Sequence, residues 1–375
     1  MTVTQTFSAD VYAYRLQAAQ QAAADKGIDL LLIGTGPDFA YLTGSWVSSH
    51  ERLTVLVVPQ RGNAWIAAPN TDITDIKGAP VGELDVELCG WDDGENPYEL
   101  ALRGAGDGLG KVALGQSLTA DHVLRFQDLL PQASYELATY ALAELFTRKD
   151  EAEIAELRKA GQAIDAVHAQ VPRLLQAGRT EAEVAHELEK LILREHSVID
   201  FVIVGSGPNG ANPHHSFSDR ALAEGEPVVV DIGGTLPSGY HSDCTRTYVV
   251  GGDLSQAPQD FQDAYAVLAD AQAAGRAAAH PGNTAADIDD ITRKAIAAAG
   301  WGDNFVHRTG HGIGLSTHEE PFIMEGNDLT LEEGMAFSIE PGIYVEGKWG
   351  MRLEDIVVLT KDGYESLNLA PREVR

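Results

Sequence analysis

Two acidic residues of this chain lie in segments that otherwise look buried. Asp231 follows VVV and precedes IGG, and Glu354 is followed directly by DIVVL. A buried carboxylate is costly unless it is paired with a cation or bound to a metal ion. The chain must therefore fold so that positive charge reaches these acids.

Each of these acids belongs to a predicted β-hairpin that contains a second acid. In VVVDIGGTLPSGYHSDCTRTYVV, Asp231 stands six residues before Pro237 and Asp243 six residues after it. In FSIEPGIYVEGKWGMRLEDIVVL, Glu340 and Glu354 each stand seven residues from the turn glycine. We expect the two acids of each hairpin to lie directly opposite each other, with Cβ atoms ~4.5 to 5.5 Å apart. An exposed acid pair tolerated by water is the alternative for either hairpin taken alone.

Three histidines precede the second hairpin in HRTGHGIGLSTHEEP, at positions 307, 311 and 318. The glycines around His311 allow other backbone to approach its imidazole closely, so we predict it as a metal ligand, with the other two lining the substrate. An oxygen-rich ligand set with one imidazole suits Mn²⁺, Mg²⁺ or Co²⁺. Two such ions ~3.5 to 4 Å apart would ionise a shared water near neutral pH, which predicts a hydrolase.

The order of predicted elements divides the chain into two domains. A helix over residues 9–26 and the strand-like runs LLLIGTGPDFAYLTG, RLTVLVVP and AWIAAP predict an α/β domain of residues 1–145. Residues 150–250 and 255–360 each read as two helices followed by a hairpin. We therefore predict a second domain of residues 150–375, built from two related halves with helices on one side of a joined sheet and a cleft between the halves.

The segment FVIVGSGPNGANPHH, residues 201–215, also fits the pattern G-x-G-x-x-G. That pattern marks a dinucleotide site only where a helix begins at the glycines. Pro208 and Pro213 predict an extended or turning loop over residues 207–213 instead. The loop then delivers His214 to the site, and we do not expect a bound nucleotide.

Composition narrows the partners and the location. The formal net charge of −29 disfavours nucleic acid and anionic membrane surfaces. The N-terminal segment lacks the features of a signal peptide, and the longest apolar run, IDLLLIG, is too short to span a bilayer, so we expect a cytoplasmic protein. Cys89 and Cys244 are too few for a disulfide framework and are expected to be buried thiols.

Six motifs together resemble the pita-bread metallopeptidases, a family that includes methionine aminopeptidase, aminopeptidase P, prolidase and the metal-free creatinase. The motifs are NPHH, VVVDIGG, SDCTRT, HRTGHGIGLSTHE, IEPGIY and GMRLEDIVVL. The resemblance covers residues 150–375. The first domain, with DFAYLTG at residues 38–44, resembles the creatinase and prolidase N-terminal domain, which favours the proline-directed branch. The implied fold is a creatinase-like α/β domain followed by a pita-bread catalytic domain.

The resemblance implies a dinuclear metal centre. In the family five side chains hold two divalent ions, and the matching positions here are Asp231, Asp243, His311, Glu340 and Glu354. By resemblance, Asp243 and Glu354 bridge the ions, Asp231 completes one site, and His311 with Glu340 completes the other. Glu340 also serves as the general base. We expect Mn²⁺, with Co²⁺ or Zn²⁺ as alternatives.

The resemblance adds four further site residues, namely His214, His307, His318 and Arg352. His214 and His318 would hold the substrate and help to protonate the leaving nitrogen. Arg352 would orient a carboxylate ligand or bind the C-terminus of the substrate, and a plain salt bridge is its alternative. His214, His318 and Arg352 are the candidate anchors for a dipeptide carboxylate.

The expected function is hydrolysis of the Xaa-Pro bond of dipeptides by a homodimer. Aminopeptidase P activity on longer peptides and a metal-free binding protein are the alternatives, and hydrolysis of non-peptide bonds stays open. In the homodimer, the segment from Trp46 to Arg52 would reach toward the cleft of the partner.

Overall fold

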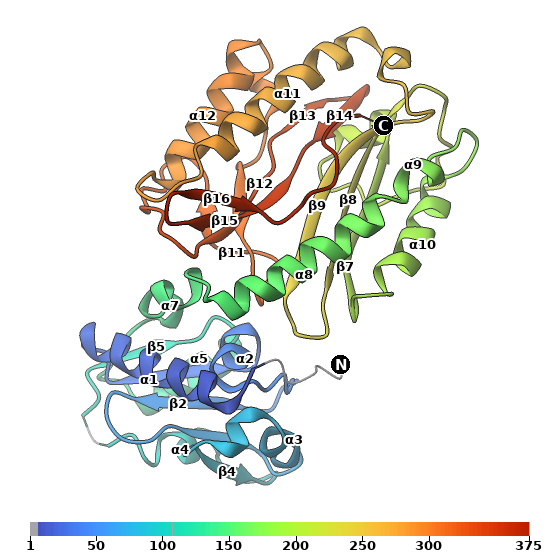
Figure 1. The fold of residues 1–375 in the computed structure, drawn as a ribbon. Coiled ribbons are helices and arrows are strands. Elements are labelled where there is room, and N and C mark those ends of the chain that lie inside the picture. Colours follow the sequence, from blue (N-terminus) through green and yellow to red (C-terminus); the bar gives the residue numbers. More distant parts are fainter. Residues whose placement is uncertain (1–6, 107, 375) are drawn as a thin grey trace. The chain divides into compact units, whose positions relative to one another are not determined.

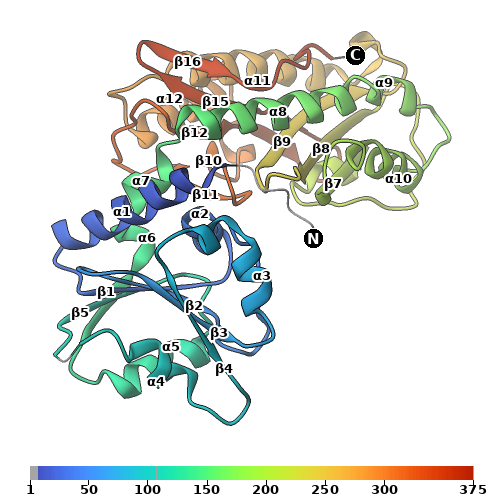
Figure 2. The same ribbon diagram turned by 60° about the horizontal axis from the view of Figure 1, so that its bottom comes forward.

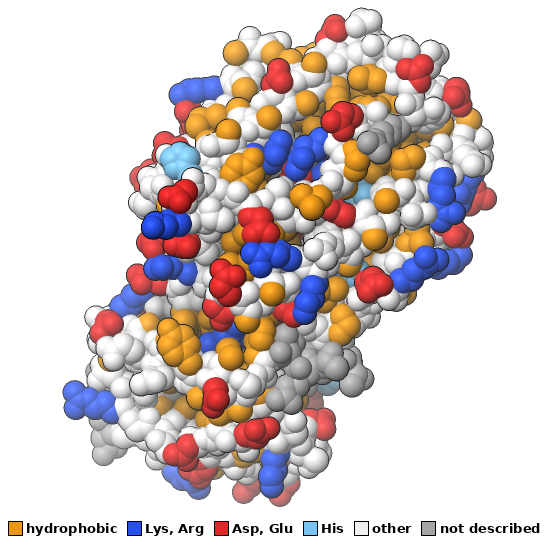
Figure 3. Space-filling model, viewed as in Figure 1, with side chains coloured by type: hydrophobic (Ala, Val, Ile, Leu, Met, Phe, Trp, Pro, Cys, Tyr) orange, Lys and Arg blue, Asp and Glu red, His pale blue; other side chains and the backbone are white. Residues whose placement is uncertain are grey.

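The computed structural model describes residues 7–106 and 108–374. The chain divides into two compact units, one that ends at Phe146 and one that begins at Thr147 (Figure 1). Acidic and basic side chains are interspersed on the face drawn in Figure 3 rather than gathered in one patch of either sign. Within the described ranges, no helix combines the length and the apolar character needed to cross a membrane.

The first unit is built on a mixed six-stranded sheet with the strand order β4-β3-β2-β1-β5-β6. Its strands are β1 (Leu30–Gly34), β2 (Val55–Pro59), β3 (Trp65–Pro69), β4 (Glu87–Trp91), β5 (Lys111–Leu114) and β6 (Ser134–Leu137). Every residue of β1, β2 and β3 is buried, which agrees with their nearly continuous apolar sequences. This sheet therefore needs cover on both faces.

Helices cover both faces of this sheet. They are α1 (Ala9–Asp25), α2 (Pro37–Thr43), α3 (Ile73–Gly78), α4 (Pro97–Leu102), α5 (Ala120–Leu129) and α6 (Ala138–Ala141), with a 3₁₀ turn η1 (Pro80–Glu83). Helix α7 (Ala143–Thr147) follows and ends at the first residue of the second unit. Figure 2 shows α4 and α5 on one face and α1 and α2 on the other. The predicted first helix is confirmed. The segment PDFAYLT, expected in a strand-like run, is instead helix α2, because Pro37 suits a first turn and Gly44 at φ 71° ends it.

The second unit repeats its pattern of helices and strands. The first half contains α8 (Glu151–His168), α9 (Val171–Leu174), α10 (Glu181–Ile192), β7 (Val198–Ser206), η2 (Gly207–Ala211), β8 (Pro227–Thr235) and β9 (His241–Val249). The second half contains η3 (Leu254–Gln256), α11 (Gln259–Ala277), α12 (Ala285–Ala298), η4 (Gly302–Asn304), β10 (Gly310–Gly312), β11 (Glu319–Ile323), β12 (Ala336–Ile339), β13 (Gly342–Val345), β14 (Trp349–Arg352), β15 (Asp355–Thr360) and β16 (Gly363–Ser366). Two helices followed by a hairpin occur in both halves, as predicted.

The halves are joined along β9. One apolar core lies between α8–α10 and β7–β9, and two others lie between α11–α12 and the strands of the second half (Figure 1). The Glu354 amide donates to the Thr245 carbonyl at 3.2 Å, and the Arg352 amide donates to Thr247 Oγ1 at 3.0 Å. These bonds bring the two predicted hairpins side by side.

The register predicted for the first hairpin is wrong by two residues. Asp231 pairs with Thr245, and Asp243 pairs with Gly233, so the two acids are not directly opposite. The loop is centred on Ser238 rather than Pro237, because Leu236 donates to the carbonyl of Tyr240 across it. A shift of two residues keeps both carboxylates on the same face of the sheet.

The register predicted for the second hairpin is confirmed. Gly342 pairs with Arg352, and Ile339 pairs with Asp355, around the turn at Gly347. Each predicted strand is interrupted, however, so that Glu340 and Glu354 lie between strands rather than within them. Pro341 contributes to the interruption, since proline cannot donate to a strand ladder.

A buried histidine of α8 predicts a pH dependence of stability. His168 Nε2 lies 2.9 Å from the Cys244 carbonyl oxygen, and Nδ1 lies 2.9 Å from the Tyr248 hydroxyl. A carbonyl oxygen only accepts, so Nε2 carries a hydrogen. Burial, assisted by Arg246, lowers the pKa of His168 to about 3. The neutral form is therefore the one that the folded protein stabilises.

The stability from His168 should be complete above the unfolded pKa of ~6.5 and should be lost progressively as pH falls toward the folded pKa. Urea denaturation in chelator at pH 7.5, 6.5 and 5.5 measures the free energy of unfolding on which this prediction depends. Between the last two points, the free energy of unfolding of the wild type should fall by about 1 kcal/mol more than that of His168→Gln. His280→Gln, at an exposed histidine, is the control and should follow the wild type. Equal slopes for wild type and His168→Gln would contradict the prediction.

Candidate metal centre

Every predicted site residue lines one cavity of about 940 Å³ within the second unit. These residues are His214, Asp231, Asp243, His307, His311, His318, Glu340, Arg352 and Glu354. They come from both halves of the unit, and an apolar wall that includes Phe201, Ile203 and Phe217 faces the same space. The structure thus brings together residues that are up to 140 positions apart in the sequence.

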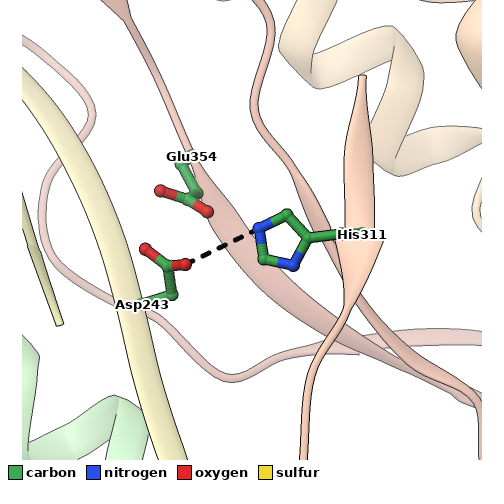
Figure 4. Close-up of side chains that lie close together, drawn as sticks. All are labelled: Asp243, His311 and Glu354. Carbon is green, nitrogen blue, oxygen red and sulfur yellow. Dashed lines mark ion pairs between the residues drawn. The ribbon is translucent and has the colours of Figure 1, made fainter. Parts of the chain in front are cut away.

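Three of the predicted ligands form a compact group at this cavity. Asp243 on β9, His311 on β10 and Glu354 between β14 and β15 each offer a ligand atom, and these atoms all lie within 4.8 Å of one another. Figure 4 shows the three side chains pointing toward a common point, with His311 Nε2 3.7 Å from Asp243 Oδ2. All three residues are buried. This group could hold a metal ion.

The hydrogen bonds of His311 present the correct nitrogen to that point. Its Nδ1 lies 3.0 Å from the Gly312 carbonyl oxygen and must donate to it, which leaves Nε2 as the nitrogen that faces the acids. A Cβ atom on Gly310 would lie 1.9 Å from the Ser338 carbonyl, and one on Gly312 would lie 2.2 Å from the Glu320 carbonyl. The glycines thus permit the close backbone approach that the sequence predicted. A histidine whose Nδ1 donates to a carbonyl is held in the orientation that metal-binding histidines adopt.

Asp231 and Glu340 extend the group. Asp231 Oδ2 accepts from Arg352 Nη2 at 2.5 Å, and Glu340 Oε1 lies 3.2 Å from His311 Nε2. Among the described residues, the other oxygen of Asp231, Oδ1, and one oxygen of Glu354, Oε1, are buried without a hydrogen-bond partner. Buried polar atoms rarely lack partners. These two oxygens are therefore available to metal ions.

The pKa shifts of the four acids also indicate a metal site. Burial, together with repulsion from neighbouring carboxylates, raises the pKa of Asp243 and of Glu354 well above their usual values. Burial also raises the pKa of Asp231, although Arg352 opposes it. Burial alone would raise the pKa of Glu340 too, but His311, His307 and Arg352 lower it to about 2. The acids carry more negative charge than the protein compensates, and an oxygen-rich set with one imidazole nitrogen fits divalent cations.

Arg352 contacts several protein groups at the edge of the ligand group. Its guanidinium donates to Asp231, to Thr245 Oγ1 at 3.0 Å and to the Tyr344 hydroxyl at 2.7 Å, and its residue is 4% exposed. The structure therefore supports the orientation of a carboxylate ligand. Binding of the substrate C-terminus by Arg352 stays a prediction, which would have to compete with these protein contacts.

The three other histidines occupy different environments. His307 is engaged at both ring nitrogens, since Nδ1 donates to the Arg308 carbonyl at 2.7 Å and Nε2 accepts from the Tyr344 hydroxyl at 2.9 Å. His214 and His318 are exposed residues on the cavity wall. Desolvation, with the nearby His311 and Arg308, lowers the pKa of His318 to about 4. His214 and His318 are thus placed to contact a ligand, whereas His307 supports Tyr344.

Sequence reasoning missed three residues of this site. Thr245 accepts from Arg352 Nε and donates to Glu354 Oε2 at 2.8 Å, so one hydroxyl orients both side chains. Tyr344 links Arg352 to His307. Arg308 lines the cavity with its guanidinium 4.5 Å from the ring centroid of Phe322. The sequence could have indicated Thr245, because it follows Asp243 by two residues and therefore lies on the same face of the strand.

The glycine pattern of residues 205–210 does not begin an α-helix. The chain forms the 3₁₀ turn η2 and then continues through the loop that carries His214. The context required for a dinucleotide site is therefore absent from this segment, as predicted.

Comparison with known proteins gives two family matches. Residues 155–361 match the model of metallopeptidase family M24, and residues 15–145 match that of the creatinase/prolidase N-terminal domain. A protein named probable dipeptidase PepE from Mycobacterium tuberculosis is 49% identical over 98% of this chain and 97% of its own length. An Xaa-Pro dipeptidase from Lactobacillus helveticus is 34% identical over 96% of this chain and 98% of its own length. The crystal structure of dipeptidase PepE from Mycobacterium ulcerans superposes with a TM-score of 0.94 at 47% identity and covers 98% of both chains.

Proposed function

This chain belongs to metallopeptidase family M24, and on that premise we propose that it is a metal-dependent dipeptidase that hydrolyses the Xaa-Pro bond. The observation that carries the proposal is the set of four acids and one imidazole nitrogen at a single cavity, with buried oxygens that no described protein group satisfies. The family and the donor set both imply divalent metal ions.

We assign the ions to five ligands, Asp231, Asp243, His311, Glu340 and Glu354. Mn²⁺ is our proposed ion, since carboxylate-rich sites suit it. When bound, such ions supply Lewis acidity, which lowers the pKa of water and offsets negative charge on the reacting carbonyl. Arg352 and Thr245 hold the acids in place through the hydrogen bonds described above.

Glu340, which is also a proposed ligand, and two histidines act on the water and the substrate. Glu340 accepts a proton from the attacking water, and its low pKa reflects the cationic neighbours that also stabilise its ionised form. His214 and His318 hydrogen-bond the substrate and help to deliver a proton to the leaving nitrogen. That proton matters because the nitrogen of an Xaa-Pro bond carries no hydrogen and must leave as a secondary amine.

The position of Arg308 supports the proposal that the substrate is a dipeptide rather than a longer peptide. The cavity is lined by two arginines, and the guanidinium of Arg352 is engaged by the protein. The guanidinium of Arg308 lies against the ring of Phe322, at the wall of the cavity. A guanidinium can bind a carboxylate through two parallel hydrogen bonds. We therefore propose that Arg308, rather than Arg352, binds the free carboxylate of the substrate.

The relatives support both parts of the proposal. Proteins named dipeptidase share 49% and 47% identity with nearly the whole chain, and a protein named Xaa-Pro dipeptidase shares 34%. The homodimer and the cytoplasmic location expected from the sequence stay predictions.

One assay tests the reaction and the substrate class together. The protein is stripped with chelator, restored with Mn²⁺, and given an Xaa-Pro dipeptide or an Xaa-Pro tripeptide with the same first residue. Activity should disappear on chelation and return with Mn²⁺. We expect kcat/KM for the dipeptide to exceed that for the tripeptide by about tenfold to a hundredfold, since only the dipeptide places its carboxylate at Arg308. Cleavage of the tripeptide alone would identify an aminopeptidase instead, and a protein that binds no divalent ion would match the metal-free alternative.

A further inference from the structure

The first residue of α10, Glu181, has a fully buried carboxylate outside the metal centre. A buried carboxylate is costly unless several donors satisfy it. Its backbone amide donates to the carbonyl of Arg220 at 3.0 Å, which fixes the start of the helix against the chain that follows the His214 loop. This acid takes no part in the proposed reaction.

All the side-chain partners of Glu181 belong to one loop. Ser206 donates to Oε1 through its amide at 2.7 Å and through its hydroxyl at 2.6 Å. Asn209 Nδ2 donates to both oxygens at 3.1 Å. Ser218 Oγ donates to Oε2 at 2.7 Å, and His215 Nε2 donates to the same oxygen at 2.8 Å. One carboxylate thus holds the two ends of the loop and two points between them.

This loop forms one wall of the cavity. It carries His214, Ser216 and Phe217, which all line the cavity. The ring of His214 is exposed, whereas the neighbouring His215 is bonded to Glu181. His214 lies in a turn in which the His215 amide donates to the Asn212 carbonyl at 3.1 Å, so the bond from His215 to Glu181 restrains the backbone that places His214 at the cavity.

The bonds of Glu181 are charge-assisted. Burial alone would raise its pKa, but the donors from Ser206, Ser218 and His215 outweigh burial and lower the pKa. Arg220 adds to this by donating to Ser206 Oγ at 2.6 Å while it pairs with Glu226. Hydrogen bonds to an ionised acceptor are stronger than those between neutral groups, so the loop is held firmly.

We propose that Glu181 is a positioning residue, which clamps residues 206–218 so that His214 is held at the reacting bond. The inference rests on the proposed role of His214 in the hydrolysis. The clamp reduces the motion of a side chain that must meet the substrate at hydrogen-bond distance, and a displacement of ~1 Å at such a group can cost a hundredfold in rate.

A double-mutant cycle tests the proposal in the Mn²⁺-loaded, full-length protein. Glu181→Gln keeps the shape of the side chain and removes its charge. We expect it to lower kcat/KM by about tenfold to a hundredfold in the wild-type background. In the His214→Ala background the same change should lower kcat/KM by less than about twofold, because a residue that acts only through His214 has nothing left to position. Glu187→Gln is the matched control, because this partly exposed acid of the same helix pairs only with Lys190 and lies outside the cavity lining, and the variant should retain wild-type activity.

Two further measurements keep the test decisive. Ser218→Ala removes one donor and spares the carboxylate, so it should show the same pattern with a smaller loss if Glu181→Gln fails to fold. Amide hydrogen exchange without substrate should be faster over residues 207–217 in Glu181→Gln and unchanged elsewhere. If the wild type hydrolyses no Xaa-Pro peptide, the proposed function fails, while hydrogen exchange still reports on the clamp. Equal losses in both backgrounds, or wild-type activity of both clamp variants, would overturn the proposal.

Discussion

Asp243→Asn is expected to lose bound metal and activity together. An amide keeps the shape of the side chain but removes a charge from the centre of the ligand group, where Asp243 Oδ2 lies 3.7 Å from His311 Nε2. Because metal-ion catalysis contributes several kcal/mol, kcat should fall by about a hundredfold to a thousandfold or more. Elemental analysis of the purified protein and a peptidase assay at saturating substrate measure the two losses.

The thermal stability of Asp243→Asn separates metal loss from misfolding. The pKa of Asp243 is raised well above its usual value by burial and by Glu354, so this group destabilises the metal-free fold as pH rises above the unfolded pKa of ~3.9. In chelator at neutral pH the variant should therefore melt at the same temperature as the wild type or higher. Added Mn²⁺ should raise the melting temperature of the wild type only. Asp328→Asn, at an exposed acid, is the control, and full activity of Asp243→Asn would be incompatible with the assigned role.

Arg308→Ala is expected to abolish most of the preference for a free C-terminal carboxylate. Leaving a bound charge without its partner costs ~2 to 4 kcal/mol, so kcat/KM for an Xaa-Pro dipeptide should fall by about 30-fold to 1,000-fold. The same dipeptide with an amidated C-terminus should lose less than about threefold, because it has no carboxylate to bind. The comparison of the two substrates thus isolates the interaction between Arg308 and the substrate carboxylate.

Arg308→Lys and Arg173→Ala complete this experiment. Lysine keeps the charge but not the planar fork, so it should restore part of the dipeptide activity. Arg173 is exposed on α9 and outside the cavity lining, and its substitution should change neither rate. Equal losses for the acid and the amide would show that Arg308 shapes the cavity rather than binding the carboxylate.

The sequence alone determined the architecture of the second unit and the set of candidate ligands. Two helices and a hairpin recur because the local periodicity of apolar residues is strong in each half. The acids stood out because Asp231 and Glu354 interrupt apolar runs, where an uncompensated charge is too costly to be incidental. The second hairpin could also be predicted in register, since its turn is short and is centred on a glycine at φ 73°.

Only the tertiary structure decided which side chains are free to act. The loop at Ser238 set the first hairpin two residues away from its predicted register, because turn hydrogen bonds rather than strand pattern fix the pairing. Arg352 and Arg308 look equally available in the sequence, yet Thr245 and Tyr344 engage the first and leave the second at the cavity wall. Likewise, Glu181 resembles any acid at the start of a helix until the fold buries it among the donors of a distant loop. Local patterns report on burial and periodicity, whereas these assignments depend on hydrogen bonds between elements far apart in the chain.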